Sequence, residues 1–275
     1  MKHNIKIIQL FKEKDFTNTR VPYYLIFLLE GNYNFSIDKK QYHCSGKNIL
    51  FTSPFQNIQW LDLTPINASK LSFHGDFYCI EYHKKEVACN GILFNNIYLS
   101  PFVCLSDSLY EEISKLLLKI KEIQYSNQSY DVSILKSYLQ LILALINKQK
   151  LLDIHHLDYI LEQDYVLFKG QLEEFFFKHK SVLFYAELNG LTLDSFSKKI
   201  KKVYGKTPTQ LIKERVILES KKLLHLTNKS IKEIAHELGF SDEFYFSRYF
   251  KKETGISPLK FRSEVGISIV AKKSM

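Results

Sequence analysis

Basic side chains recur at a fixed spacing near the C-terminus of this 275-residue chain. Lys198 and Lys201 are matched, 50 positions later, by Arg248 and Lys251. Lysine and arginine donate hydrogen bonds to phosphate oxygens, and both can donate to the O6 and N7 acceptors of guanine. The chemistry that these residues offer is therefore that of nucleic-acid binding.

The distribution of charge indicates the same kind of partner. The formal net charge is +9 at pH 7, and nearly all of it lies in the last part of the chain. Residues 171–275 carry 20 Lys and Arg against 12 Asp and Glu, whereas residues 1–170 carry 18 against 17. A basic excess confined to one part of a chain is typical of a protein that binds a polyanion. A lysine-rich solvated surface has the same composition, so charge alone is weak evidence.

Other chemistries find little support in the residue pattern. The four cysteines lack the CxxC spacing of zinc and redox sites, and we predict reduced thiols: Cys44, Cys79, Cys89 and Cys104. The histidines of the N-terminal half stand alone, whereas metal ligation needs converging side chains. Neighbours on a strand point to opposite faces, which separates His43 from Cys44. We therefore predict no metal site, no cofactor and no enzymatic activity.

The basic positions belong to an internal repeat in the last 90 or so residues. Its offset rises from 49 to 50 along the repeat, so the second copy contains one inserted residue. The matched pairs include residues with special backbone or capping roles: Ala186/Ala235, Gly190/Gly239, Thr192/Ser241, Phe196/Phe246, Gly205/Gly255 and Pro208/Pro258.

Each repeated residue type has a structural reason. Glycine adopts the left-handed conformation that ends a first helix, and Thr192 or Ser241 then caps a second one. The spacing predicts two helix–turn–helix motifs, over residues 182–202 and 231–252, separated by a helix from Pro208 to about Leu226. Such a helix is roughly 28 Å long, close to the roughly 34 Å between successive major-groove faces of DNA. A plain helical solenoid would explain the repeat but not the basic excess.

The N-terminal half has a different pattern. Short apolar runs between Tyr23 and about Pro101, separated by turn residues, predict the strands of a sandwich or small barrel. Ser108 with Glu111 resembles a capping box, and a helical period follows to Ile123. A second helix, from about Val132 to Asn147, is apolar almost all round. Such a helix must be covered on several sides, either within the monomer or by a partner subunit.

At this point the chain resembles a known family. The segment 230–262, SIKEIAHELGFSDEFYFSRYFKKETGISPLKFR, is similar to the second helix–turn–helix of the AraC/XylS transcription regulators, and residues 176–208 resemble the first more loosely. The N-terminal half resembles a cupin-like sensor domain. The resemblance implies an α+β multidomain fold: a small β-barrel or cupin-like domain (1–105), two flanking helices in a dimerisation and connecting region (106–168), and an all-α DNA-binding domain (169–265).

The resemblance also implies which residues contact DNA. Asp194 and Glu243 have a rival interpretation, because a carboxylate in a first helical turn favours the helix dipole without any contact to DNA. The chain departs from the family pattern at Asn189, Leu193 and Asp194, which predicts weaker base discrimination by the first motif. The full set of candidates comprises Thr192, Asp194, Ser197, Lys198, Lys201, Ser241, Glu243, Phe244, Tyr245, Ser247, Arg248 and Lys251.

These expectations combine into a cytoplasmic, homodimeric transcription regulator that binds double-stranded promoter DNA. The resemblance further implies contact with RNA polymerase and control by a small-molecule effector bound in the N-terminal domain. The aromatic residues of its strands suit either a pocket or, more commonly, a core, so we name no ligand contacts. No apolar run approaches the roughly 20 residues of a membrane helix, so we expect no membrane partner. The alternative is an architectural DNA-binding protein without ligand control.

Overall fold

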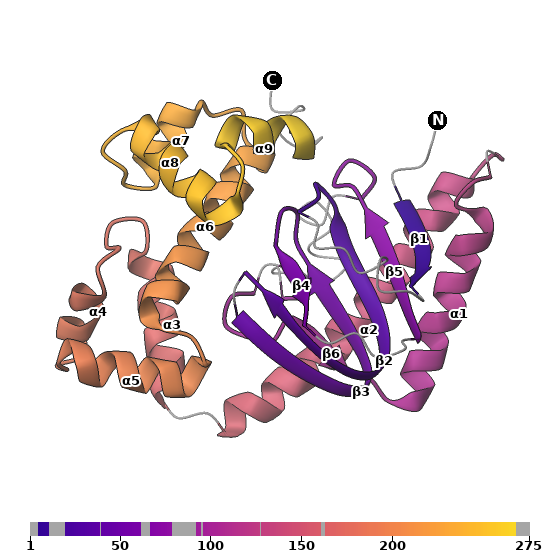
Figure 1. The fold of residues 1–275 in the computed structure, drawn as a ribbon, viewed down its shortest axis with the longest axis horizontal. Helices are drawn as coiled ribbons and strands as arrows, with labels where there is room; N and C mark the ends of the chain where they lie inside the picture. The colour runs from indigo at the N-terminus through magenta and orange to yellow at the C-terminus, as the bar shows by residue number, and fades with distance from the viewer. Residues whose placement is uncertain are drawn as a thin grey trace. The chain divides into compact units, whose positions relative to one another are not determined.

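The chain combines an N-terminal antiparallel sheet with a C-terminal helical region, as the sequence predicts (Figure 1). It divides into two compact units: Met1–Asn96 with Pro101–Asp153, and Ile97–Ser100 with Ile154–Met275. The domain limits expected at residues 105 and 168 remain predictions. The computed structural model describes residues 5–10, 20–38, 40–61, 67–78, 92–94, 96–126, 128–160 and 163–267.

The first unit is built on one antiparallel sheet. The described strands are β1 (Ile5–Leu10), β2 (Tyr24–Ile37), β3 (Lys40–Thr52), β4 (Ile58–Trp60), β5 (Asn67–Phe73) and β6 (Phe102–Cys104). Their order is β1-β5-β2-β3-β6, and β4 pairs with β2 beside this path. The long hairpin of β2 and β3 forms the centre, because β2 pairs with β3 along almost its whole length. Closure into a barrel or cupin remains a prediction.

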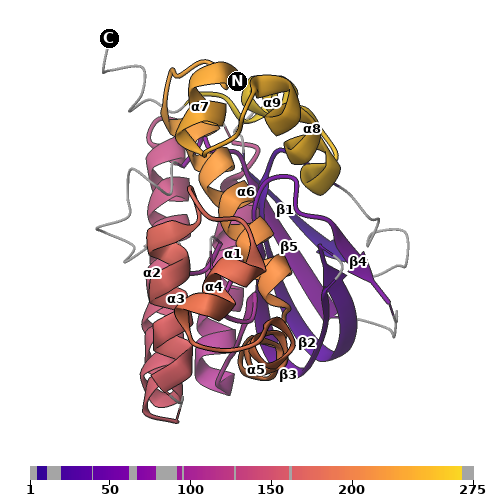
Figure 2. The same cartoon turned by 90° about the vertical axis from the view of Figure 1, so that its left-hand side faces the viewer.

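Alternation along β2 gives the sheet two apolar faces, since successive side chains of a strand point to opposite sides. Ile26 and Leu28 face a core that is shared with the helices α1 (Asp107–Ile123) and α2 (Asp131–Ile160). Phe27 and Phe35 face a second, more aromatic cluster. Both helices lie against the same side of the sheet (Figures 1 and 2).

The start of α1 corrects one expectation. Ser106, rather than Ser108, is the N-cap, and its hydroxyl accepts a hydrogen bond from the Leu109 backbone N–H. The helix therefore begins before the predicted capping box, and Ser108 lies inside its first turn. At the other end Gln124 accepts a hydrogen bond from the backbone N–H of Ile7, at 2.7 Å, which ties α1 to strand β1.

Helix α2 is longer than predicted and keeps an apolar stripe at its surface. Its inner residues, such as Leu139 and Ile142, are fully buried against the sheet. Ile134 and Leu141 lie seven positions apart on another face and remain 40 % and 43 % exposed. The sheet covers one side of this helix, and α1 contacts another, where the Lys119 ammonium lies 5.7 Å from the centroid of the Tyr138 ring.

Part of the N-terminal half lies outside the described residues. The strand predicted over 77–82 is one case: Phe77 and Tyr78 lie in a turn, and the remainder is not described. Cys79 and Cys89 also fall outside. Within the described ranges no helix has the length and apolar character to cross a membrane. Nor do three metal-binding side chains gather anywhere in that part of the chain.

Candidate nucleic-acid interface

The second unit consists mainly of helices, and α6 extends from one helical group to the other (Figure 1). Helices α3 to α5 form the first group and α7 to α9 the second. Their bounds are α3 (Gln163–Phe175), α4 (Val182–Leu188), α5 (Leu193–Tyr204), α6 (Pro208–Leu226), α7 (Ile231–Glu237), α8 (Glu243–Thr254) and α9 (Pro258–Val265). The α4–α5 and α7–α8 pairs occupy the two predicted motif ranges, and α6 has the predicted ends.

The turns of the two motifs have the same backbone hydrogen bonds. Gly190 and Gly239 have φ angles of 63° and 69°. The residue after each glycine donates its N–H to the carbonyl of the repeated alanine: Leu191 to Ala186 at 3.0 Å, and Phe240 to Ala235 at 2.9 Å. This 6→1 bond, with glycine in the left-handed conformation, is a Schellman ending. The repeated Ala–Gly spacing therefore encodes one turn geometry, used twice.

The caps that follow differ between the motifs. Thr192 caps α5 as predicted, and its side chain accepts from the Ser195 N–H. Ser241 does not cap α8: Asp242 does, accepting from the Tyr245 N–H at 2.7 Å. This hydrogen bond holds the pKa of Asp242 below its ordinary value. The inserted residue of the second copy explains the correction, because it shifts the capping position by one.

Helices α5 and α8, the second helix of each motif and here called the recognition helices, each bury one side and expose the other. Phe196, Ile200, Phe246 and Phe250 are at most 2 % exposed, as the repeat predicts. Of the predicted contact residues, Ser197, Glu243 and Ser247 are half-buried and the other nine are exposed: Thr192, Asp194, Lys198, Lys201, Ser241, Phe244, Tyr245, Arg248 and Lys251. The exposure of these residues suits an interface, while their contact with DNA remains a prediction.

One pair of predicted residues is brought into direct contact. Lys198 and Asp194 form an i, i+4 ion pair at 2.7 Å on α5, and both side chains are largely exposed. The Asp194 carboxylate raises the pKa of Lys198. At the corresponding positions of α8 stand Phe244 and Arg248, so the second helix offers an aromatic ring where the first offers a carboxylate. The two recognition helices are thus chemically unequal.

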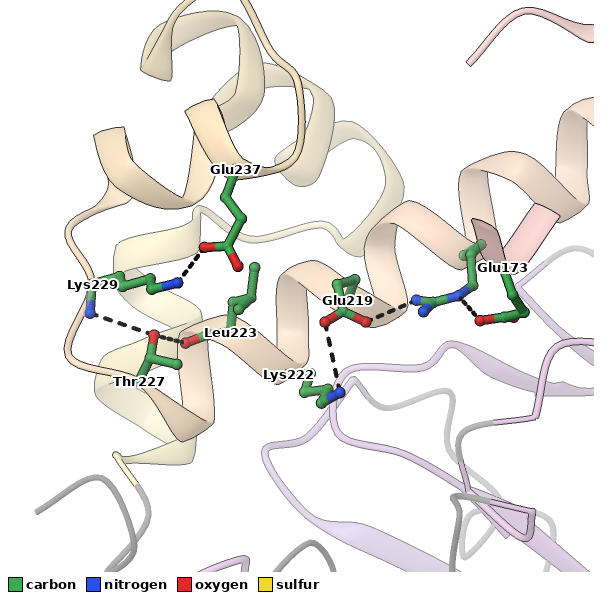
Figure 3. A network of polar contacts seen from close by, with 8 residues as sticks. Glu173, Glu219, Lys222, Leu223, Thr227, Lys229 and Glu237 are labelled. Atoms are coloured by element: carbon green, nitrogen blue, oxygen red, sulfur yellow. Dashed lines mark hydrogen bonds and ion pairs between the residues drawn. The ribbon is translucent and has the colours of Figure 1, made fainter. Parts of the chain in front are cut away.

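Helix α6 is fixed to its neighbours by a polar network (Figure 3). Arg215 donates to Glu173 of α3 at 2.8 Å and to Glu219 at 3.0 Å, and its guanidinium stacks 3.9 Å from the Phe176 ring centroid. Beyond the C-terminal end of α6, Lys229 forms an ion pair with Glu237 of α7. The Arg215 contacts therefore hold α6 against α3, and the Lys229–Glu237 pair ties the segment that follows α6 to α7 of the second motif.

Lys180 is a further positioning residue that the sequence analysis did not identify. Its ammonium donates to the carbonyl of Phe177 at 3.0 Å, of Leu238 at 2.6 Å and of Gly239 at 3.3 Å. It also lies 4.8 Å from the Phe240 ring centroid. Burial lowers the pKa of Lys180. The residue joins the segment before α4 to the turn of the second motif, and no local pattern reveals a contact over 58 positions.

Residues Ile97–Ser100 complete the helical unit, although they precede strand β6 in the chain. The Tyr98 hydroxyl donates to Glu173 at 2.6 Å, and the Lys206 ammonium donates to the carbonyl of Ile97 at 2.8 Å. Lys206 is buried and also pairs with Glu214 of α6. The junction of α5 and α6 is therefore built partly from a distant segment.

Comparison with known proteins identifies this arrangement. Residues 185–264 match the family described as a helix-turn-helix domain. The C-terminal region is an AraC-type helix–turn–helix domain. The match includes the second turn of α4 and most of α9, so the AraC-type domain contains both motifs and the α6 spacer.

Relatives of the AraC-type domain include bacterial transcription regulators. The chain is 41 % identical over 63 residues to the HTH-type transcriptional activator Btr of Bacillus subtilis, covering 23 % of this chain and 12 % of Btr. It is 23 % identical over 159 residues to the activator RhaS of an Enterobacter species, covering 58 % and 56 %. The chain thus matches less than two thirds of either relative's length. The structure of ToxT from Vibrio cholerae O395 is also similar, with 18 % identity, a TM-score of 0.40, and 95 % of this chain and 96 % of that chain covered.

Proposed function

We propose that this protein is a transcription regulator that binds specific double-stranded DNA through α5 and α8 and acts by binding, without catalysis. The observation that carries the proposal is the pair of recognition helices, each with exposed basic side chains, in two motifs separated by the 19-residue helix α6. At about 1.5 Å per residue α6 is roughly 28 Å long, which suits two successive major grooves on one side of a duplex.

Lys201 and Lys251 are proposed to contact phosphates rather than bases. Both are exposed in the last turns of their helices, three residues beyond Lys198 and Arg248. Each neutralised phosphate contributes about 0.9 to the slope of log K against log salt. The double variant Lys201→Ala/Lys251→Ala is expected to reduce the magnitude of that slope by about 2. The measurement is a titration of duplex binding by fluorescence anisotropy at several salt concentrations.

A matched control removes the same charge elsewhere. Lys115 and Lys119 are exposed on α1 in the first unit, and their double alanine variant should keep the slope of the parent protein. An unaltered slope in the Lys201/Lys251 variant, or an equal reduction in the control, would contradict phosphate contact at these two lysines.

We further propose that the protein is a homodimer that associates through α2. The exposed stripe that includes Ile134 and Leu141 supports this, because contiguous apolar surface on a helix is characteristic of an interface. Light scattering is expected to give twice the 32.4 kDa mass of the chain. A monomeric mass that does not change with concentration would contradict the proposal.

The first unit is proposed to bind a small-molecule effector. Its support is the aromatic character of the sheet face away from α1 and α2, where the half-buried Trp60 packs on the buried rings of Phe27 and Phe35. A ligand that binds one arrangement of the protein better than another shifts the population toward that arrangement. In this way an effector would change the arrangement in which the two DNA-binding domains of the proposed dimer meet the DNA.

The direct test of specific binding is selection from a random duplex library at near-physiological salt with the full chain. Two enriched blocks about one helical turn apart are expected. Binding that is sequence-independent and easily disrupted by salt would contradict specific regulation. It would favour the architectural alternative instead.

A further inference from the structure

The two recognition helices carry a matched set of three side chains on one face. In α5 the first triad is Asp194, Ser197 and Lys198, and 50 positions later in α8 the second triad is Phe244, Ser247 and Arg248. Residues three and four apart on a helix are neighbours on its surface. The first residue of each triad lies in the first turn of its helix, the part that contacts base edges when such a helix enters the major groove.

The aromatic ring of the second triad is held outside the protein core. Phe244 is 68 % exposed. The nearby Phe240 ring instead packs against Tyr245, Phe246 and Tyr249, with ring centroids 5.2 to 5.7 Å apart. These contacts fix the α8 surface around Phe244 while the ring itself faces solvent. Ser247, about one turn further along the helix, is small and half-buried, so Phe244 and Arg248 are the large exposed side chains of this triad.

A phenyl ring has no hydrogen-bonding group and can distinguish bases only by apolar contact. In the major groove the C5-methyl group of thymine is the apolar feature of the base edges. Arg248, four residues later, can donate to O6 and N7 of guanine. The first triad has no apolar member: Asp194 stands at the position of Phe244, and its carboxylate forms an ion pair with Lys198.

From these observations we infer that α8 recognises a block of DNA containing thymine, whose C5-methyl group packs on Phe244, beside a guanine bound by Arg248. The inference rests on the proposed function and adds the base chemistry of one block. Phe244 is then a specificity-determining residue that acts by burying a single methyl group.

The test replaces thymines of a selected duplex, one at a time, by deoxyuridine, which removes only the methyl group. The α8 block is identified as the one whose base preference relaxes in Arg248→Ala. At one thymine of that block, deoxyuridine is expected to weaken binding of the parent protein about fourfold. This factor corresponds to the free energy of burying one methyl group. Phe244→Ala should bind the two duplexes equally. Leu193→Ala, which removes an exposed apolar side chain at the start of α5, should retain the parent protein's preference.

The outcomes separate this inference from the proposed function. Equal binding of thymine and deoxyuridine duplexes by the parent protein would overturn the inference and leave specific binding intact. An undiminished thymine preference in Phe244→Ala would also overturn it, since another group would then contact the methyl. If Phe244→Ala bound the thymine duplex as tightly as the parent protein does, the inference would again be overturned. The exposed ring would then be assigned to a contact with another protein. Failure to bind any selected duplex specifically would instead refute the proposed function.

Discussion

Gly239→Ala is expected to lower the free energy of unfolding of the helical unit by about 3 kcal/mol or more. Two effects combine at this position. The backbone has a φ of 69°, where a side chain adds strain. In addition, a Cβ atom there would lie only 2.2 Å from the carbonyl oxygen of Phe177. Relief of that overlap requires displacement of the turn, which would disturb the hydrogen bonds that Lys180 donates to Phe177, Leu238 and Gly239.

Gly190→Ala provides the matched control. Gly190 occupies the equivalent turn of the first motif with a φ of 63°, but among the described residues beyond its two chain neighbours no heavy atom lies within 4 Å of an added Cβ. Its substitution should therefore cost only the backbone strain, about 1–2 kcal/mol. Urea unfolding followed by circular dichroism at a helix wavelength measures both. Equal losses for the two variants would contradict the close packing of the second turn against the segment before α4.

Arg248→Ala is expected to weaken binding to a selected duplex by about 1–3 kcal/mol, equivalent to about 5- to 150-fold. Arg248 is exposed on the recognition helix α8, and a guanidinium can contact both acceptors of one guanine. Lys198, at the equivalent position of α5, is bonded to Asp194 and should contribute less. Competition binding against a scrambled duplex separates the specific loss from the general effect of removing one positive charge.

The conservative variant Arg248→Lys refines this test. Lysine keeps the positive charge but cannot form the bidentate hydrogen bonds of a guanidinium. The variant should therefore retain non-specific affinity for DNA and still lose most of the preference for the selected sequence. Unchanged affinity of Arg248→Ala for the selected duplex would show that this side chain does not contact a base.

The helical unit was the more predictable part of the molecule because its signals are local. Glycines in left-handed turns, hydroxyl caps and proline at the first helical position act within a few residues of where they stand. The repeat therefore predicted both motifs and the ends of α6. The short apolar runs after Tyr23 likewise predicted strands, and the long strand β2 lies at the start of that stretch.

Features that depend on distant contacts or on one-residue choices escaped prediction. Ser241 and Asp242 are both good capping residues, so local chemistry does not decide between them. In the sequence Lys180 resembles any surface lysine, because its hydrogen bond to the Leu238 carbonyl forms only in the folded chain. Similarly, no sequence pattern assigns Ile97–Ser100 to the helical unit, because the pairing of Lys206 with Ile97 spans 109 positions.

Methylation interference at guanine N7 on a selected duplex tests the central claim most directly, because N7 lies in the major groove. If α5 and α8 enter successive major grooves, modified guanines should block binding in two patches on one face, about one helical turn apart. The patch contacted by α8 should weaken in Arg248→Ala. Interference in a single patch, or none in the major groove, would contradict the account of two recognition helices acting together.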